Sequence, residues 1–299
     1  MMRPSALCLG PSALCLGPCA LCLAVVLAGA ALGAAQQPTF SARVEGVRID
    51  VLVTDGGRPV AGLGPADFEV RDNGVPQTID LVSLGDVSVS VVMVLDLSAS
   101  LVGSRLVTLQ RAGVTLLEAL TPPDQAALLS FNTAVVQRVP LTSDLARLRG
   151  ALLGTTADGD TALIDATLAG MLLGDTEGGR TLVVVFSDGI DTASFTSPDV
   201  ALGTARRVNG VVYGVAASGG DARFLRDVSE ATGGRVIDIG AAGNPGPAFL
   251  EILQEFRRRY VITYAPTGVP RGGWHQLNVR VRRGNARVQA RPGYFSAQP

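Results

Sequence analysis

Three oxygen-bearing side chains follow an apolar run near residue 90. The stretch VVMVLDLSAS ends in Asp96, Ser98 and Ser100, each two residues from the next. Two later polar loops carry Thr161, in GDTALIDA, and Asp188, in FSDG. Hydroxyl and carboxylate oxygens are hard ligands that suit Mg²⁺, Mn²⁺ or Ca²⁺ rather than zinc. The sequence therefore predicts a divalent metal site formed by Asp96, Ser98, Ser100, Thr161 and Asp188.

A simpler explanation exists for each loop taken alone. Aspartate and serine are preferred at helix N-caps, so Asp96 and Ser98 could cap the next helix, while Asp188 could lie in a turn. Single short motifs carry a high false-positive risk, whereas three such loops in order are a much more specific signal. We therefore favour the metal site over three unrelated caps.

The elements that must position these loops alternate between buried strands and amphipathic helices. SVSVVMVLD and TLVVVFSDG are continuous apolar runs, which are typical of strands buried on both faces of a sheet. Between and after them the periodicity predicts helices, one of them SDLARLRGALLG with Ser143 as its N-cap, and others near 197–208, 221–232 and 247–259. This alternation predicts an α/β fold with a Rossmann-like, doubly wound, mostly parallel sheet. Ligands bind such sheets at the carboxyl ends of strands, where Asp96 and Asp188 lie.

Short alternating strands flank this region on both sides. RIDVLVTD and ADFEVRDNGVPQ precede it, the latter with an Asn73-Gly74 hairpin turn, and YVITYAP and HQLNVRVRRGNARVQARPGYF follow it. Because short isolated β segments are marginally stable, we expect residues 40–85 and 260–299 to pair into one β-sandwich-like domain.

Several charged or aromatic residues of the C-terminal flank have open roles. The side chains of Arg280, Arg282, Arg287 and Arg291 could bind an anion, but a solvated face of a half-buried hairpin turning at Gly284-Asn285 is the favoured interpretation. Trp274 and His275 are expected in a turn before that hairpin, with Trp274 packing at the rim and His275 exposed.

The first 35 residues predict a secretory signal peptide. They carry one charge, Arg3, followed by an uncharged run that ends in Gly- and Ala-rich sequence, so we expect cleavage before Gln36. An uncleaved membrane anchor is the alternative, since the run is long enough to span a bilayer. All four cysteines lie in this segment, so the cleaved chain would hold neither disulfides nor thiolate metal sites. We expect a secreted, periplasmic or cell-envelope protein.

Composition narrows the classes of function. The net charge of −1 argues against a nucleic-acid-binding protein. The 25 basic residues are all arginine, which removes P-loop and Schiff-base lysines from consideration. A Ser–His–Asp hydrolase would need the single histidine, yet the sequence has no G-x-S-x-G. No dinucleotide fingerprint is present, so we expect no small-molecule cofactor and no enzyme activity.

The motifs D-L-S-A-S, G-D-T-A-L-I-D-A and F-S-D-G resemble the three loops of the metal-ion-dependent adhesion site (MIDAS) of von Willebrand factor A (VWFA) domains. The resemblance covers residues 88 to about 258. The flanks VTDGGRPVAGLGPADFEVRDNGVPQ and VQARPGYF resemble a bacterial secreted VWFA-related family. One departure is Asp160, where the family commonly has glycine before the threonine. Its carboxylate could make the site more negative and favour Ca²⁺, but we expect it to face solvent.

The residue patterns and the resemblance together predict four segments: a signal peptide (1–35), a β-rich flank (36–87), a VWFA domain (88–259) and a β-rich C-terminal flank (260–299). The resemblance also implies a mechanism. Both serine hydroxyls would bind Mg²⁺, or Mn²⁺ or Ca²⁺, directly, Thr161 directly or through water, and both aspartates largely through water. The open coordination position would then attract an Asp or Glu carboxylate of a partner protein. We expect a secreted, adhesion-type binding module; the alternatives are a structural or envelope-assembly protein and, last, a metal-assisted hydrolase.

Overall fold

The computed structural model describes residues 46–85, 87–175, 179–217, 222–241 and 243–296. The predicted signal peptide and its cleavage point before Gln36 lie outside these ranges. No helix within them is both long and apolar enough to cross a lipid bilayer.

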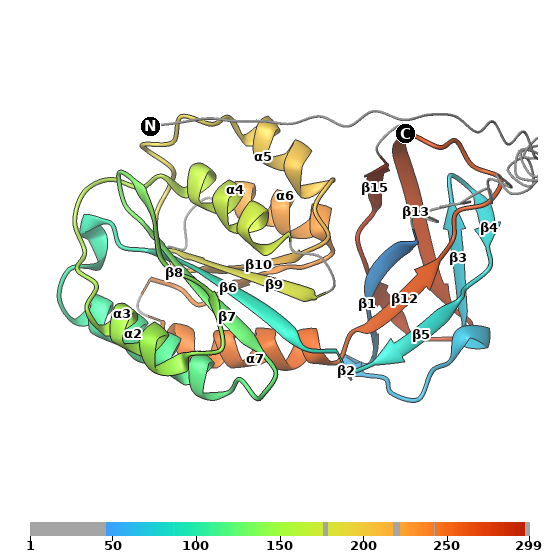
Figure 1. Ribbon diagram of the computed structural model, residues 1–299, viewed down its shortest axis with the longest axis horizontal. Helices are drawn as coiled ribbons and strands as arrows, with labels where there is room; N and C mark the ends of the chain where they lie inside the picture. Colours follow the sequence, from blue (N-terminus) through green and yellow to red (C-terminus); the bar gives the residue numbers. More distant parts are fainter. Residues whose placement is uncertain (1–45, 86, 176–178, 218–221, 242, 297–299) are drawn as a thin grey trace, which may run out of the picture. The chain divides into compact units, whose positions relative to one another are not determined.

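The central part of the chain is an α/β fold built on one six-stranded sheet (Figure 1). The strand order is β11-β10-β9-β6-β7-β8, and every neighbouring pair is parallel except β7 and β8. The strands are β6 (Val89–Asp96), β7 (Gln125–Phe131), β8 (Val135–Thr142), β9 (Arg180–Ser187), β10 (Val211–Ala216) and β11 (Val236–Asp238). The predicted mostly parallel, Rossmann-like sheet is therefore confirmed.

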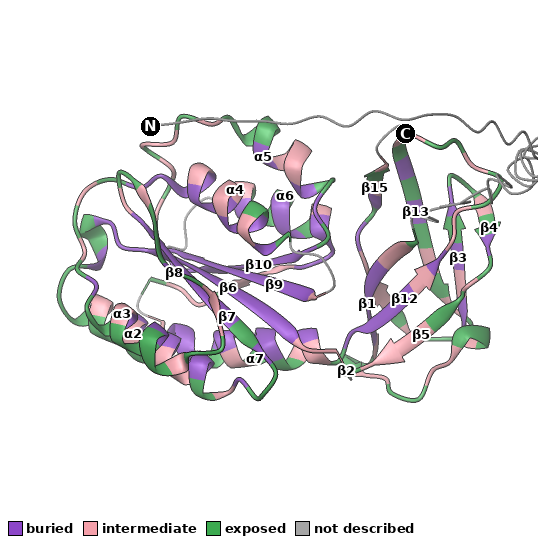
Figure 2. Cartoon of the chain, viewed as in Figure 1, coloured by how far each residue is buried: buried purple, intermediate pink, exposed green. Residues whose placement is uncertain are grey.

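Helices cover both faces of this sheet, which explains the continuous apolar runs in its central strands. Val91, Met93 and Leu95 of β6 pack in one core with helices α2, α3 and α7, while Val92 and Val94 pack in a second core with α4, α5 and α6. Every residue of β6 is buried (Figure 2). The helices are α2 (Ser104–Glu118), α3 (Leu145–Leu153), α4 (Leu163–Gly174), α5 (Pro198–Ala205), α6 (Arg223–Thr232) and α7 (Pro245–Arg257).

The N-cap predicted for α3 was one residue off. Asp144, not Ser143, is the N-cap, and its Oδ1 accepts a hydrogen bond of 2.9 Å from the backbone N–H of Arg147. Both residue types suit the position, so local preference alone could not separate them.

The flanking strands form two antiparallel sheets that combine both ends of the chain. One has the order β14-β1-β12-β5, with β2 added at β1, and the other the order β15-β13-β3-β4. A shared apolar core that includes Ile49, Phe68, Val70, Ile262 and Leu277 fills the space between them. The strands are β1 (Val47–Asp55), β2 (Arg58–Pro59), β3 (Phe68–Asp72), β4 (Val75–Gln77), β5 (Leu81–Leu84), β12 (Tyr260–Tyr264), β13 (Gly273–Val281), β14 (Arg287–Gln289) and β15 (Gly293–Ser296).

Three expectations for the C-terminal flank were wrong. The strands on either side of Gly284-Asn285 do not form a hairpin, because β13 pairs with β3 and β15 whereas β14 pairs with β1. Trp274 and His275 lie within β13 rather than in a turn. His275 is buried, and its Nδ1 lies 2.8 Å from Oδ1 of the buried Asp72, which also accepts hydrogen bonds from Tyr264 and Tyr294.

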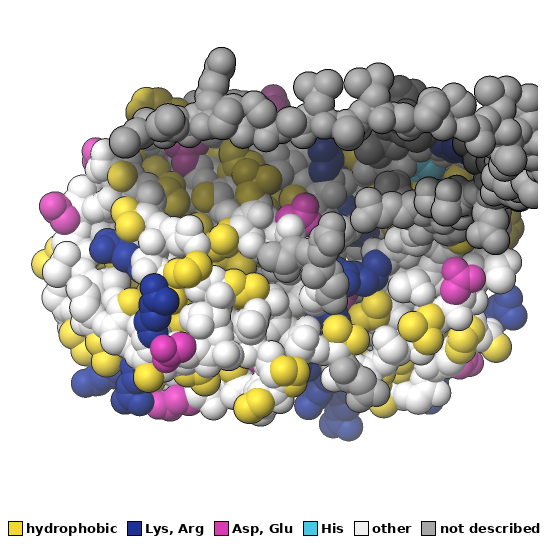
Figure 3. Space-filling model, in the orientation of Figure 1, with side chains coloured by type: hydrophobic (Ala, Val, Ile, Leu, Met, Phe, Trp, Pro, Cys, Tyr) yellow, Lys and Arg dark blue, Asp and Glu magenta, His cyan; other side chains and the backbone are white. Residues whose placement is uncertain are grey.

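The four C-terminal arginines divide into two groups. Arg280, Arg282 and Arg287 are exposed, as expected for a solvated face. Arg291 is buried instead, and its guanidinium donates to the carbonyls of Val208 at 3.0 Å and Arg206 at 2.9 Å, at the end of α5. A planar guanidinium can satisfy several carbonyls at once, which makes a buried arginine tolerable there. On the face shown in Figure 3, basic side chains are scattered among acidic and hydrophobic ones.

Two more buried arginines connect the flanking β-strands to the α/β part of the chain. Nε and Nη2 of Arg180, at the start of β9, donate to Oδ1 of Asp50 in β1 at 2.9 and 2.6 Å. Nη2 also donates to the carbonyl of Phe256 at the end of α7, at 2.9 Å. Arg259, which follows α7, donates to the Tyr213 hydroxyl at 2.7 Å. The end of α7 is thus hydrogen-bonded to Arg180 of β9, which in turn is paired with Asp50 of β1.

Candidate functional site

The first candidate ligand, Asp96, is the last residue of β6 and is fully buried. Its Oδ1 accepts a 2.9 Å hydrogen bond from the backbone N–H of Ser98, and its Oδ2 accepts a 2.7 Å bond from the Ser187 hydroxyl. Ser187 ends the neighbouring parallel strand β9. Because the chain leaves β6 and β9 toward opposite sides of the sheet, Asp96 lies at the topological switch point, where ligands bind in this type of fold.

A row of hydroxyls connects the first loop to the third. The Ser98 and Ser100 Oγ atoms lie 3.0 Å apart, and the Ser100 hydroxyl donates a 2.8 Å hydrogen bond to Oδ1 of Asp188. These contacts join residues that are 88 positions apart in the chain. The structure therefore brings four of the five predicted ligands into one hydrogen-bonded group.

The alternative interpretation, in which these residues cap the following helix, is contradicted. Helix α2 begins at Ser104, its N-cap is Gly103, and no side chain caps it. Ser98 precedes the 3₁₀ turn Ala99–Leu101, but its side chain makes no capping hydrogen bond there. The serine hydroxyls are directed toward each other and Asp188 instead.

The fifth predicted ligand, Thr161, lies beside this group. Its Oγ1 is 3.6 Å from the position that a Cβ atom on Gly189 would occupy, so it approaches the residue next to Asp188. The backbone of Thr161 is fixed by the third loop: its N–H donates to Thr192 Oγ1 at 3.0 Å, and its carbonyl accepts from the N–H of Thr192 at 2.9 Å. Asp160 is exposed, as expected, and its N–H donates to Thr133 Oγ1.

Arg105 is a charged member of the site that the sequence did not reveal. It lies in the first turn of α2, and its Nη2 is 2.7 Å from Oδ2 of Asp188. The same guanidinium donates to the carbonyl of Ser100 at 2.9 Å and to that of Ala241 at 3.3 Å. Both oxygens of Asp188 are therefore bonded, one to Ser100 and one to Arg105.

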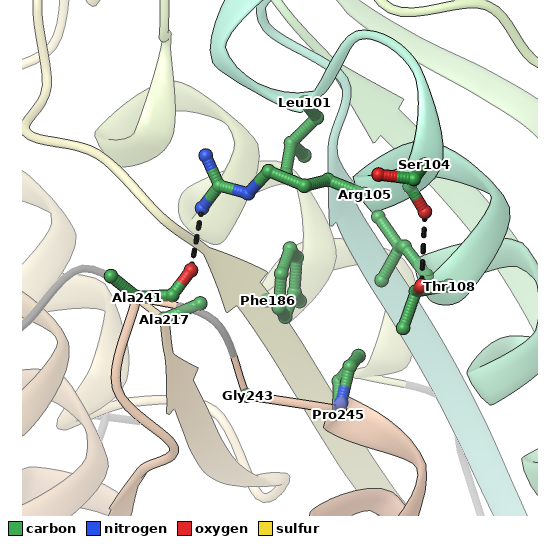
Figure 4. A pocket seen from close by; sticks show the side chains of 10 residues that line it. Leu101, Ser104, Arg105, Thr108, Phe186, Ala217, Ala241, Gly243 and Pro245 are labelled. Atoms are coloured by element: carbon green, nitrogen blue, oxygen red, sulfur yellow. Dashed lines mark hydrogen bonds between the residues drawn. The ribbon is translucent and has the colours of Figure 1, made fainter.

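A small cavity of about 260 Å³ opens beside Arg105 (Figure 4). Leu101, Phe186 and Pro245 form apolar parts of its wall, and the side chain of Arg105 crosses it toward the carbonyl of Ala241. Two residues that line the cavity are Leu101, which follows Ser100, and Phe186, which is two residues before Asp188. The cavity therefore adjoins the group of oxygens.

The loop that follows Asp188, residues 189–197, is hydrogen-bonded to α4. The two carboxylate oxygens of Asp165 accept 2.9 Å hydrogen bonds from the backbone N–H groups of Phe195 and Thr196. Burial alone would raise the pKa of Asp165, but the bonds from Thr196 and Phe195 outweigh it and lower that pKa. The loop holds Phe195 with 99% of its surface exposed and Ile190 with 64% exposed.

Burial and a neighbouring carboxylate both act on Asp96. Burial raises the pKa of Asp96, hydrogen bonds from Ser187 and Ser98 counteract this in part, and the nearby charge of Asp188 raises it further. A cation near both carboxylates would stabilise their ionised forms. In this structure the guanidinium of Arg105 is the positive charge next to Asp188.

The donor chemistry fits a hard divalent ion. Three hydroxyls and two carboxylates offer only oxygen, which suits Mg²⁺, Mn²⁺ or Ca²⁺. Across the described ranges, no three histidine, cysteine, aspartate or glutamate side chains gather as a metal-binding group. At this site the residues that could hold a metal are Ser98, Ser100 and Thr161, through their hydroxyls, together with Asp96 and Asp188.

Comparisons with known proteins concern the region that contains these residues. The family model of the von Willebrand factor type A domain matches residues 91–190, a range that contains all five candidate ligands. A curated relative, inter-alpha-trypsin inhibitor heavy chain H4 from Bos taurus, is 28% identical over 142 residues, which cover 43% of this chain and 16% of the relative. The chain thus corresponds to a small part of that relative's length.

Solved structures share the fold. Proximal thread matrix protein 1 from the mussel byssus, in a structure with a zinc-occupied MIDAS motif, has a TM-score of 0.51 and 17% identity, over 62% of this chain and 49% of that chain. The von Willebrand factor domain of the type V pili tip protein Mfa5 from Porphyromonas gingivalis has a TM-score of 0.47 and 13% identity, over 56% of this chain and 94% of that chain. Residues 91–190 therefore match the von Willebrand factor type A domain, and the sheet and helices around them have the α/β architecture expected of such a domain.

Proposed function

We propose that this chain is a divalent-metal-dependent, adhesion-type protein-binding module. In this proposal the hydroxyls of Ser98, Ser100 and Thr161 bind Mg²⁺, Mn²⁺ or Ca²⁺, and Asp96 and Asp188 hold it largely through water. The metal, when bound, supplies a positive charge that neutral first ligands leave only partly compensated. A carboxylate of a partner protein, from Asp or Glu, is the ligand that this charge would attract.

One observation carries the proposal. The row from Ser98 through Ser100 to Asp188 connects two loops through contacts of 3.0 and 2.8 Å. It lies at the carboxyl ends of β6 and β9, which the chain leaves toward opposite sides of the sheet. The carboxyl ends of neighbouring parallel strands are where ligands bind in this type of fold, which is why a group of oxygens there supports a metal site. The exposed apolar side chains beside the row argue for a protein partner, because large apolar groups beside a polar centre are typical of binding surfaces. Val102 and Ile190, each 64% exposed, lie two residues from Ser100 and Asp188, and the exposed Phe195 belongs to the same loop as Ile190.

The proposal places the protein outside the cytoplasm and assigns it no catalytic role. The proposed location depends on the predicted signal peptide of residues 1–35. Binding rather than catalysis fits a site whose donors are hydroxyls and carboxylates with no histidine among them.

A structural or assembly role is the second candidate. The observation that favours it is the Arg105–Asp188 ion pair, since the site neutralises part of its own charge without a metal. A protein of similar fold, proximal thread matrix protein 1 of the mussel byssus, is by its name a matrix protein.

Two measurements separate these candidates. The first is the change in melting temperature of the mature protein on adding Mg²⁺, Mn²⁺ or Ca²⁺, compared between the wild type and Ser98→Ala. The second is capture of native secreted proteins on immobilised protein, with and without a chelator. Metal-dependent stabilisation and chelator-sensitive capture that Ser98→Ala abolishes would support the adhesion role. Stabilisation without capture would favour assembly, and no response to any metal would exclude the metal site.

A further inference from the structure

The guanidinium of Arg105 is bonded to one of the proposed metal ligands. It contacts Oδ2 of Asp188 at 2.7 Å, and Asp188 is the ligand contributed by the third loop. Asp188 is nearly fully buried, with 1% of its side chain exposed, whereas the Arg105 side chain is 40% exposed. The pair therefore consists of a fixed carboxylate and a cation that reaches it from the solvent side.

We propose that Arg105 is an internal cation that competes with the divalent metal for Asp188 and so sets the affinity of the site. The inference rests on the proposed metal site. A monovalent guanidinium and a divalent ion cannot both approach one carboxylate without mutual repulsion. The ion must therefore either displace Arg105 or bind beside an uncompensated positive charge, and both weaken its binding.

The surroundings of Arg105 provide for its displacement. Its guanidinium keeps two neutral acceptors, the carbonyls of Ser100 and Ala241, when the contact with Asp188 is lost. The side chain also borders the cavity of about 260 Å³, so it has space to move without displacing other side chains. Release of Asp188 thus leaves the arginine hydrogen-bonded and partly hydrated rather than buried without partners.

The charges predict the direction and size of the effect. With Arg105 the group of Asp96, Asp188 and the guanidinium carries a formal charge of −1, and without it −2. A neighbouring full charge shifts the ionisation equilibrium of a carboxylate by about 10-fold to 1000-fold. Because Arg105 is partly exposed and solvent screens it, we expect the low end, about tenfold.

The experiment measures Mn²⁺ affinity by isothermal titration calorimetry with the metal alone. Arg105→Gln keeps a polar side chain of similar reach and removes the charge, and we expect it to bind Mn²⁺ about tenfold more tightly than the wild type. Arg111→Gln is the matched control, because it removes the same charge from an exposed position of the same helix, and we expect a change of less than about twofold. Arg105→Lys retains the charge, so its affinity should stay close to that of the wild type.

The outcomes separate this inference from the metal site itself. If wild type and Arg105→Gln bind Mn²⁺ equally, or the variant binds more weakly, Arg105 is not a competitor, although the metal site stands. If no protein binds Mn²⁺, the proposed function fails and the inference fails with it. A readout on the wild type avoids any folding defect of the variant: the Nε–Hε NMR signal of Arg105, assigned with Arg105→Lys, should shift on adding Mg²⁺. An unchanged signal at saturating Mg²⁺ would overturn the inference.

Discussion

The buried Arg180–Asp50 ion pair should couple the unfolding of the β-sheets to that of the α/β domain. Arg180 is 1% exposed and Asp50 is 7% exposed, and the pair connects β9 to β1, 130 residues apart. Removing one partner of a buried ion pair lowers the free energy of unfolding by about 3–5 kcal/mol, because the remaining buried charge is left without an opposite charge.

We expect Asp50→Asn to lie at the low end of this range, at about 3 kcal/mol. Arg180 would keep the carbonyl of Phe256 at 2.9 Å and the face of the Phe256 ring at 4.5 Å from its Cζ atom. The double variant Asp50→Leu with Arg180→Met carries no unpaired charge. Its loss of stability should be smaller than the sum of the losses in Asp50→Leu and Arg180→Met measured singly, with a coupling energy of about 2 kcal/mol.

Urea unfolding with two probes tests this coupling. Trp274, the single tryptophan, lies in β13 and reports on the β-sheets by fluorescence, whereas far-ultraviolet circular dichroism reports mainly on the helices. The two transitions should coincide in the wild type and separate in Asp50→Asn, with the fluorescence transition at lower urea. Glu69→Gln, which removes an exposed charge pair with Arg71, should change neither midpoint. Coincident, unshifted transitions in Asp50→Asn would show that the pair does not couple the two parts.

Three further predictions concern other parts of the molecule. Asp124→Asn should cost about 2 kcal/mol at neutral pH, because the Asp124 carboxylate accepts from the N–H groups of Val89 and Thr121 and pairs with Arg257 at 2.6 Å. Burial acts to raise the pKa of Asp124, but these bonds lower that pKa overall. The contribution of Asp124 to the free energy of unfolding is therefore present above the unfolded pKa of about 3.9 and lost as the pH falls. In urea unfolding, the difference in stability between Asp124→Asn and the wild type should narrow below about pH 4. Phe195→Ser should leave the melting temperature and Mn²⁺ affinity unchanged but weaken metal-dependent partner capture about tenfold, as for an exposed aromatic anchor; unchanged capture would remove Phe195 from the interface. Gly170→Ala should destabilise by about 1–3 kcal/mol in thermal unfolding, because its Cβ would lie 2.6 Å from Val94 Cγ2 in the core; a wild-type melting temperature would contradict that packing.

Local signals in the sequence were enough to predict the main elements. The continuous apolar run of β6 follows from burial on both faces, and the Asn73-Gly74 turn has positive φ at both residues, 47° and 82°, as the hairpin requires. The clustering of Ser98, Ser100 and Asp188 followed from a rule about strand ends in parallel sheets. These features depend on neighbours in sequence or on topology, and both are readable from a single chain.

Buried charges were not predictable in the same way. Arg291, Arg259 and His275 have the residue types of a polar surface, and what buries them is a set of partners far away in the sequence. Asp72, which contacts His275, is 203 residues away from it. Arg105 illustrates the same limit at the site, because nothing in the sequence shows that its side chain reaches Asp188, 83 residues further along the chain.

The most direct test of the metal site is the anomalous scattering of the mature protein crystallised with Mn²⁺. We predict one strong peak at about 2.0–2.6 Å from the hydroxyls of Ser98 and Ser100, with Thr161 at the same distance or one water away. Both carboxylates should lie around it, and the peak should disappear in Ser98→Ala. A map without a peak there at saturating Mn²⁺, with Arg105 still bonded to Asp188, would contradict metal-dependent binding by this domain.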